Sequence, residues 1–242
     1  MEILVFDSYE QMSAAAADKI IKQLQAVKEP VFCPASGDSP VGIFKALIRQ
    51  YKEKKIDISN WYFLGLDEWI GLDKYDQGSC RHMLDRDLFH DLKVHEDRIC
   101  FFEGKTNDPE KECDRIDEFI SKRKGIDVAL LGLGMNGHVG MNEPGTSPFS
   151  KTHVADLAPM TKEVGQKYFT APQHLSQGIT LGIATLMKAR HLVLVVSGKK
   201  KAAILQRVVE GEVSDQVPAT WLRDHPDCTL YADADAAGLL MR

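Results

Sequence analysis

The stretch Ile126–Pro144, IDVALLGLGMNGHVGMNEP, decides both the fold and the site. It opens with Val128–Leu131, a continuous apolar run typical of a parallel strand that is covered on both faces. Directly after this run, glycines alternate with polar residues that include His138 and Glu143. Ligands of open α/β sheets bind at the carboxyl ends of the strands, where such loops gather. We therefore expect the glycine-rich segment to be an active-site loop.

Apolar runs and helical periodicity alternate along the rest of the chain. They predict an α/β fold, a doubly wound, mostly parallel sheet of Rossmann-like type with helices on both faces, in a single domain over residues 1–242. About six strands are expected, at Glu2–Phe6, Val31–Pro34, Trp61–Leu66, Val128–Leu131, His191–Val196 and Cys228–Ala232, with a further short strand at Arg98–Phe102. Helices are expected at Met12–Val27, Gly42–Lys54, Cys80–His90, Asp108–Lys124, Thr161–Phe169 and Lys199–Val209.

Two further segments are interpreted by composition. The helix Asp108–Lys124 is rich in charge, and we expect those charges to form a solvated face. The segment Gly145–Pro159 has no clear periodicity, so it is either a lid or a long connection.

Composition excludes several classes of protein. The chain has 242 residues, is 44% hydrophobic and 27% charged, and has a net charge of −5, which disfavours nucleic acid as a partner. It has no apolar run long enough for a membrane span and no signal-peptide pattern, so we expect a cytoplasmic protein without a membrane partner. The five cysteines are odd in number and have no CxxC spacing, which predicts free thiols and neither a disulfide framework nor a zinc site.

Two segments have the pattern of anion-binding sites. Ser36, Gly37 and Ser39 lie in a small-residue turn between a strand and a helix, where backbone N–H groups can hold a phosphate. The alternative is an ordinary helix start, with Ser39 as the N-cap and Pro40 at the first helical position. The adjacent carboxylate of Asp38 has to point away from an anion or be neutralised.

The second segment of this kind is Lys199–Lys201, which follows a strand and Ser-Gly at the start of a helix. Cations oppose the helix dipole there, so three together suggest a bound anion. The alternative is that these lysines simply face solvent.

Acid–base chemistry has candidates at two strand ends. Asp67 and Glu68 follow the third strand, and either serve chemistry or form a turn in which one carboxylate caps the next helix. His138 has no second histidine or cysteine at metal-ligand spacing, and its position beside glycine and Glu143 favours a catalytic role over a structural one. The residues alone therefore predict an enzyme that acts on a small phosphorylated metabolite by proton transfer.

Two long motifs make a family resemblance specific. FLGLDEWIGL, residues 63–72, and GLGMNGHVGMNEP, residues 132–144, resemble the glucosamine/galactosamine-6-phosphate isomerase (glucosamine-6-phosphate deaminase) family, and the resemblance covers nearly the whole chain. The related 6-phosphogluconolactonases share the fold, but their loop continues toward Leu-Phe-Pro. This chain continues Asn142-Glu143-Pro144, which favours the deaminase branch.

The resemblance implies a reaction and a set of residues. Family members convert glucosamine 6-phosphate and water into fructose 6-phosphate and ammonia without a metal or an organic cofactor. By motif position, Asp67 would be the enolisation base, His138 would move the proton in ring opening, and Glu143 would orient it. Asn136 fills a place where some members have Asp. The phosphate would be held by Ser36, Gly37, Ser39, Lys167 and Lys201.

The phosphate region also departs from the family pattern. Asp38 and Lys167 are the departures, since the family usually has a small or amide residue in the turn and some members have Arg in place of Lys167. They leave the hexosamine epimer open, so a galactosamine-6-phosphate isomerase is the alternative, with lactone hydrolysis less favoured. A non-catalytic sugar-phosphate sensor is the alternative from another class. The sequence leaves open both allosteric control and whether the chain is a monomer or a homo-oligomer.

Overall fold

The computed structural model describes residues 1–241, and its centre is a seven-stranded sheet in which every neighbouring pair is parallel. The predicted fold class, an α/β fold with a doubly wound sheet, is confirmed. The sheet contains the six expected strands and the further short one. In spatial order they are β1 (Glu2–Phe6), β10 (Cys228–Asp233), β9 (His191–Val196), β6 (Val128–Gly132), β2 (Val31–Pro34), β3 (Tyr62–Leu64) and β5 (Ile99–Cys100).

The order of the strands reverses direction between β2 and β6. From β2 the chain moves outward through β3 to β5, then returns to β6 and moves outward the other way through β9 to β10. Phe32 pairs with Val128 and Pro34 with Leu130, so both strands end at the same edge of the sheet. A reversal of this kind splits the connections that leave the strands and creates a crevice for a ligand.

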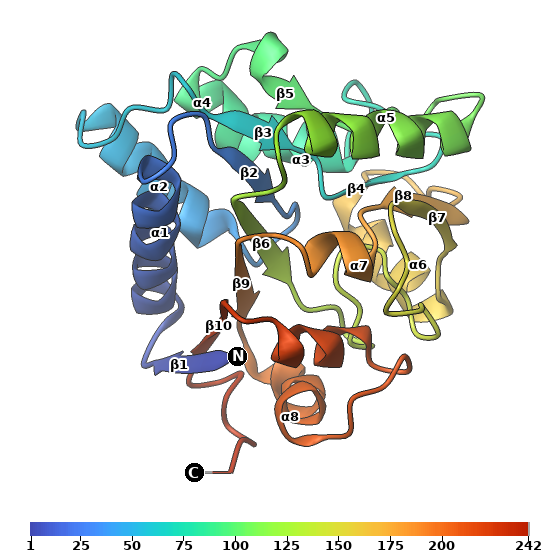
Figure 1. The fold of residues 1–242 in the computed structure, drawn as a ribbon. Helices are drawn as coiled ribbons and strands as arrows, with labels where there is room; N and C mark the ends of the chain where they lie inside the picture. The colour runs from blue at the N-terminus through green and yellow to red at the C-terminus, as the bar shows by residue number, and fades with distance from the viewer. Residues whose placement is uncertain (242) are drawn as a thin grey trace.

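Helices cover both faces of the sheet, as predicted. Figure 1 shows α1 and α2 to the left of the central strands and α7 and α8 to the right. The helices are α1 (Tyr9–Gln25), α2 (Val41–Lys52), α3 (Cys80–Leu84), α4 (His90–Leu92), α5 (Pro109–Lys122), α6 (Pro159–Gly165), α7 (Ile183–Leu186) and α8 (Ala202–Glu210). The expected helix Cys80–His90 contains a π-helical segment, Asp85–Phe89, between α3 and α4.

A small antiparallel sheet, absent from the sequence prediction, stands beside the main one. It consists of β4 (Asp67–Trp69), β8 (Gln177–Thr180) and β7 (His153–Asp156) in that order. β7 lies within the segment that was expected to be a lid or a plain connection. Asp67 pairs with Thr180, so the acidic residue is held in a sheet and does not lie in a free turn.

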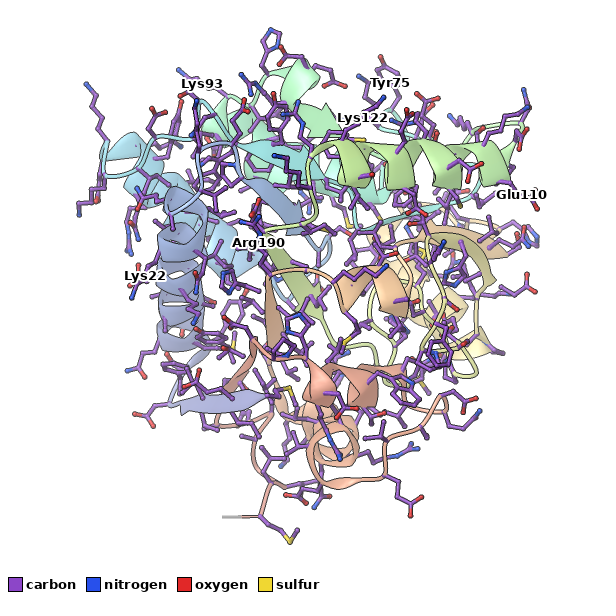
Figure 2. All side chains as sticks on the ribbon, viewed as in Figure 1. Lys22, Tyr75, Lys93, Glu110, Lys122 and Arg190 are labelled. Atoms are coloured by element: carbon purple, nitrogen blue, oxygen red, sulfur yellow. The ribbon has the colours of Figure 1, made fainter. Side chains whose placement is uncertain are left out.

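The core is one connected apolar cluster, to which the continuous strand runs contribute fully buried residues such as Val128 and Leu131. The labelled Lys22, Glu110 and Lys122 project outward from their helices in Figure 2. The expectation that α5 exposes all its charges is wrong at Glu112, which is only 6% exposed. Its carboxylate accepts hydrogen bonds from Arg115 and from the backbone N–H of Glu103.

All five cysteines are free thiols, as predicted, and all are buried. Among residues 1–241, no helix is both long and apolar enough to span a bilayer.

Candidate active site

A cleft of about 780 Å³ lies where β2, β6 and β9 end. Each of these strands continues into one wall of the cleft, and the loop after β3 adds β4. Of the predicted site residues, those that line the cleft are Asp67, Asn136, His138, Ser36, Gly37, Ser39, Lys167 and Lys201. Glu143 is not in the wall; it lies behind His138. The structure therefore brings the predicted set together around one cavity.

Asp67 is the carboxylate of the cleft, at the start of β4. Its side chain is nearly covered, with 8% of the residue exposed, and burial raises its pKa to about 6. A hydrogen bond with the Cys80 side chain and the attraction of His138 act in the opposite direction. Burial also raises the pKa of the Cys80 thiol, so this group stays protonated and donates a hydrogen bond to the carboxylate. Asp67 is thus a desolvated carboxylate within the electrostatic reach of the imidazole.

Glu68 has the structural role that the sequence left open as an alternative. It is fully buried, and its carboxylate accepts hydrogen bonds from the backbone N–H groups of Trp69, Cys80 and Arg81 at 2.8–2.9 Å. Burial raises its pKa to about 8, against the effect of these donors. Glu68 caps the start of α3 and ties it to β4, which places Cys80 beside Asp67.

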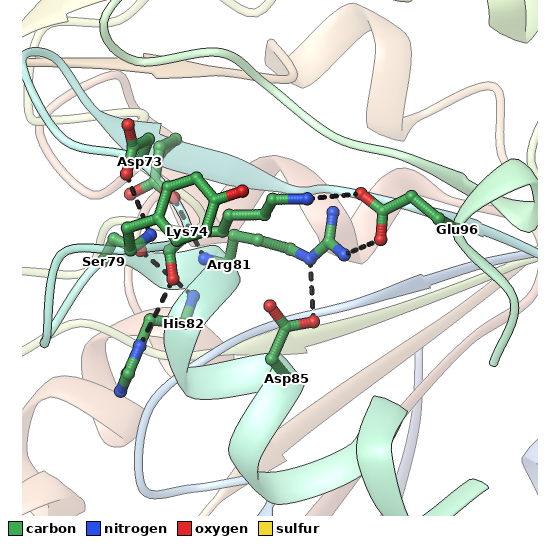
Figure 3. Close-up of polar contacts among 9 residues, drawn as sticks. Asp73, Lys74, Ser79, Arg81, His82, Asp85 and Glu96 are labelled. Carbon is green, nitrogen blue, oxygen red and sulfur yellow. Dashed lines mark hydrogen bonds and ion pairs between the residues drawn. The ribbon is translucent and has the colours of Figure 1, made fainter. Parts of the chain in front are cut away.

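An ion-pair network holds the outer side of α3 (Figure 3). The guanidinium of Arg81 donates to Asp85 at 2.9 Å and to Glu96 at 2.6 Å, and Lys74 reaches the other oxygen of Glu96 at 3.0 Å. Ser79 caps the helix by accepting from the His82 N–H. These contacts fix the loop between β4 and α3, and with it the cleft wall at Cys80.

His138 is oriented by neighbours on one side of its ring. Its Nδ1 atom is 3.5 Å from Glu143 Oε2 and 3.3 Å from Thr161 Oγ1. The Asn136 amide donates to Glu143 Oε2 at 2.7 Å, and the Asn136 side-chain oxygen accepts from the backbone N–H of His138 at 3.2 Å. Burial acts to raise the pKa of Glu143, but the contacts with His138, Thr161 and Asn136 together leave that pKa below its usual value. A carboxylate behind an imidazole fixes its tautomer and stabilises its protonated form.

Two glycines of the loop are required by its geometry. A Cβ atom at Gly134 would overlap the His138 ring. Gly137 has a φ of +89°, and a Cβ there would lie 2.6 Å from Val217 Cγ1. Both facts explain why a glycine-rich segment follows β6.

The serine turn between β2 and α2 has the features of an anion site. The N-cap of α2 is Pro40, without a side-chain capping bond, so the alternative of Ser39 as an N-cap is wrong. Among the hydrogen bonds of residues 1–241, the backbone N–H groups of Ser36–Ser39 are not donors. Gly37 has a φ of +86°, and a Cβ there would lie 2.8 Å from the Tyr168 hydroxyl. The turn therefore presents serine hydroxyls and N–H groups to the cleft.

Two lysines bring positive charge to this turn from other segments. Lys201 ends the 3-10 turn Lys199–Lys201 after β9, and its ammonium donates to the Leu133 carbonyl. Burial, together with repulsion from Lys167, lowers the pKa of Lys201 to about 8. Lys167 lies in the 3-10 turn Gln166–Tyr168 after α6 and pairs with Asp38 at 2.6 Å. Of the two possibilities that the sequence left for Asp38, the structure shows the carboxylate paired with a positive charge.

Sequence reasoning missed three residues of the site. Thr161 contacts His138, Cys80 contacts Asp67, and Tyr168 covers the serine turn. No motif marks them, because each meets its partner only when α6 and α3 pack against the cleft. Within residues 1–241, no group of three or more metal-ligating side chains is placed to hold an ion.

The fold and the site define an α/β protein in which a buried carboxylate, an imidazole and a lysine-flanked serine turn share one cleft, where the strand order reverses. Residues 7–231 match the family model of glucosamine-6-phosphate isomerases/6-phosphogluconolactonase, and the chain belongs to this family.

Curated relatives and solved structures agree with this membership. The chain is 36% identical to a glucosamine-6-phosphate deaminase of Thermoanaerobacter pseudethanolicus, covering 99% of this chain and 95% of the relative. It is 38% identical to that of Geobacillus sp. (strain WCH70), covering 99% and 96%. The structure of a monomeric glucosamine-6-phosphate deaminase matches with a TM-score of 0.95 and 32% identity, covering 99% of this chain and 100% of that one. A 6-phosphogluconolactonase from Trypanosoma brucei, with a TM-score of 0.78, 19% identity and coverage of 99% and 98%, shares the fold.

Proposed function

We propose that this protein is an amino sugar phosphate deaminase, which converts glucosamine 6-phosphate and water into fructose 6-phosphate and ammonia. The reaction combines an aldose–ketose isomerisation with hydrolytic loss of the amine. One observation carries the proposal: Asp67 and His138 line the same cleft as the anion cradle, defined as the turn Ser36–Ser39 together with Lys167 and Lys201. The relatives named above, at 36–38% identity over nearly the whole chain, support the same reaction.

Asp67 is the proposed base for enolisation. A carboxylate whose pKa burial raises to about 6 is mostly ionised at neutral pH, yet is a stronger base than an ordinary aspartate. It takes the proton from C2 of the open-chain sugar and returns it to C1, while the amine gives up one proton and the C1 oxygen takes one up. The resulting imine at C2 adds water and loses ammonia, which leaves the ketone of fructose 6-phosphate.

His138 is the proposed proton carrier for ring opening. Glu143 and Thr161 hold Nδ1, which leaves Nε2 as the atom that exchanges a proton with the ring oxygen and the C1 hydroxyl. Asn136 cannot exchange a proton itself, and it acts through its hydrogen bond to Glu143. Glu143 contacts the imidazole and does not line the cleft, so it is a positioning residue.

The phosphate group is proposed to bind at the serine turn. Ser36, Gly37 and Ser39 offer hydroxyls and backbone N–H groups, and Lys201 and Lys167 supply positive charge. This placement fixes one end of the sugar and sets C1 and C2 against Asp67 and His138. The proposed proton transfers are carried by Asp67 and His138 and require no metal or organic cofactor.

The test is Asp67→Asn, which keeps the shape of the side chain and removes the base. We expect ammonia release from glucosamine 6-phosphate to fall by about 10²–10⁴-fold, the usual contribution of a positioned base. Binding of fructose 6-phosphate, measured by calorimetry, should stay within about tenfold, because the phosphate contacts remain. Asp91→Asn is the charge control, since Asp91 pairs with Lys52 and is 53% exposed.

Retained turnover in Asp67→Asn would remove Asp67 from the role of base. Loss of both turnover and fructose 6-phosphate binding would point instead to a collapsed cleft, which the unfolding curve of the variant would reveal.

A further inference from the structure

Asp38 and Lys167, the two residues that depart from the family pattern, contact each other. The Lys167 ammonium lies 2.6 Å from Asp38 Oδ2, although the residues belong to segments far apart in the chain. Asp38 lies inside the serine turn, and Lys167 follows α6, so the pair joins the two walls of the cleft. Tyr168, next to Lys167, packs over Gly37 in the same turn.

Lys167, one of the two lysines proposed to hold the phosphate, is thus already engaged by the Asp38 carboxylate. Lys201 is half-buried and donates to the Leu133 carbonyl. Its pKa is lowered to about 8 by burial and by Lys167, so the two ammonium groups are within electrostatic reach of each other. The positive charge beside the serine turn therefore includes Lys201 and a Lys167 that already has a carboxylate partner, and Lys199 and Lys200 also line the cleft.

Asp38 opposes the binding of a phosphate in this cradle in two ways. The phosphate has to compete with the carboxylate for the Lys167 ammonium, and it is repelled by the same carboxylate once bound. Both effects weaken binding of a dianion, because the interaction of like charges in a cleft is unfavourable. The Asp38 and Lys167 side chains are 73% and 49% exposed, so the exchange requires no unfolding of either wall.

We propose that Asp38 is an internal counter-anion that sets the affinity of the cleft for phosphate by competing with the ligand for Lys167. The carboxylate weakens binding of sugar phosphates and favours release of a phosphorylated product. The inference rests on the proposed function only in taking a sugar phosphate as the ligand, and inorganic phosphate tests it without any turnover.

The experiment is a calorimetric titration of inorganic phosphate at low ionic strength with Asp38→Asn, Lys167→Met and the double variant. We expect Asp38→Asn to bind phosphate about three- to fivefold more tightly, the scale of one exposed charge interaction. In the Lys167→Met background, Asp38→Asn should increase the phosphate affinity clearly less, because there is no Lys167 ammonium to release from Asp38. At about 0.5 M salt the gain should shrink, since exposed charges are screened.

Asp91→Asn is the matched control, because Asp91 also pairs with a lysine, at 2.8 Å, but lies outside the cleft. It should leave the phosphate affinity unchanged. The KM for glucosamine 6-phosphate should fall in Asp38→Asn in parallel with the phosphate Kd.

Weaker phosphate binding by Asp38→Asn would overturn the proposal, since it would mean that Asp38 positions Lys167 for the ligand. An unchanged affinity, or an equal gain with and without Lys167, would overturn it too. If Asp38→Asn binds phosphate more tightly but no variant releases ammonia, the counter-anion stands and the proposed deaminase activity fails. If the protein releases ammonia but Asp38→Asn leaves the phosphate affinity unchanged, the deaminase activity stands and the counter-anion fails.

Discussion

Asp67→Asn should make the protein more stable at the same time as it removes activity. Burial raises the pKa of Asp67 from 3.8 to about 6 in the folded chain. As the pH rises, the Asp67 carboxyl therefore ionises at a lower pH in the unfolded chain than in the folded chain. Its ionisation thus favours the unfolded state. This loss of folding stability is absent below about pH 4, grows between about pH 4 and pH 6, and is complete above about pH 6. Asparagine does not ionise, so the variant escapes this loss.

The magnitude follows from the size of the shift. About two pKa units at 1.36 kcal/mol each give a gain of about 3 kcal/mol at pH 8, and roughly half of it at pH 5. For a domain of this size, a gain of 3 kcal/mol corresponds to a rise in Tm of about 6–12 °C. Active-site residues that are strained or desolvated commonly trade stability for function in this way.

The assay is urea unfolding of the wild type and Asp67→Asn at both pH values, with Asp91→Asn as the control that removes an exposed carboxylate. A gain that is the same at pH 5 and pH 8 would refute the reasoning, because it would not come from ionisation of Asp67. A loss of stability at pH 8 would mean that the hydrogen bond with Cys80 outweighs the desolvation of the carboxylate.

Three further predictions concern other residues of the cleft. Lys201 has a pKa lowered to about 8, so it loses its charge above that pH; kcat/KM of the wild type should fall as the pH rises past 8, and Lys201→Met should abolish this limb while weakening phosphate binding. Asn136→Asp removes the amide that donates to Glu143 and sets two carboxylates against each other, so one of them should hold a proton to higher pH and shift the acid limb of the kcat profile upward. Gly137→Ala should lower the free energy of unfolding by about 1–3 kcal/mol in urea melts, because φ is +89° and the added Cβ meets Val217; an unchanged midpoint would mean that the loop relaxes freely.

The parallel sheet could be predicted from the sequence because its central strands are buried on both faces. Continuous apolar runs such as Val128–Leu131 and His191–Val196 match β6 and β9 to within a residue. The small antiparallel sheet could not be predicted in the same way. β4 and β8 have three and four residues of mixed polarity, and they pair across a long stretch of chain, so no local pattern announces them.

The residues of the candidate site could be predicted from the sequence, but most of the contacts between them could not. The motifs placed Asp67, His138 and the serine turn at strand ends, and parallel topology gathered them at one edge of the sheet. The contacts of Thr161 with His138 and of Lys167 with Asp38 depend on how α6 and the turn after it pack over the cleft. That packing is set by tertiary contacts, which periodicity and motif spacing do not encode.

Ammonia release tests the central claim most directly, measured side by side with glucosamine 6-phosphate, galactosamine 6-phosphate and, for hydrolysis, 6-phosphogluconolactone. We predict ammonia from glucosamine 6-phosphate in equal amount to fructose 6-phosphate, with slower release from the galactosamine epimer and no comparable lactone hydrolysis. Lactone hydrolysis without ammonia from either amino sugar, or tight binding of the sugar phosphates without turnover, would contradict the assignment of Asp67 and His138 to deamination.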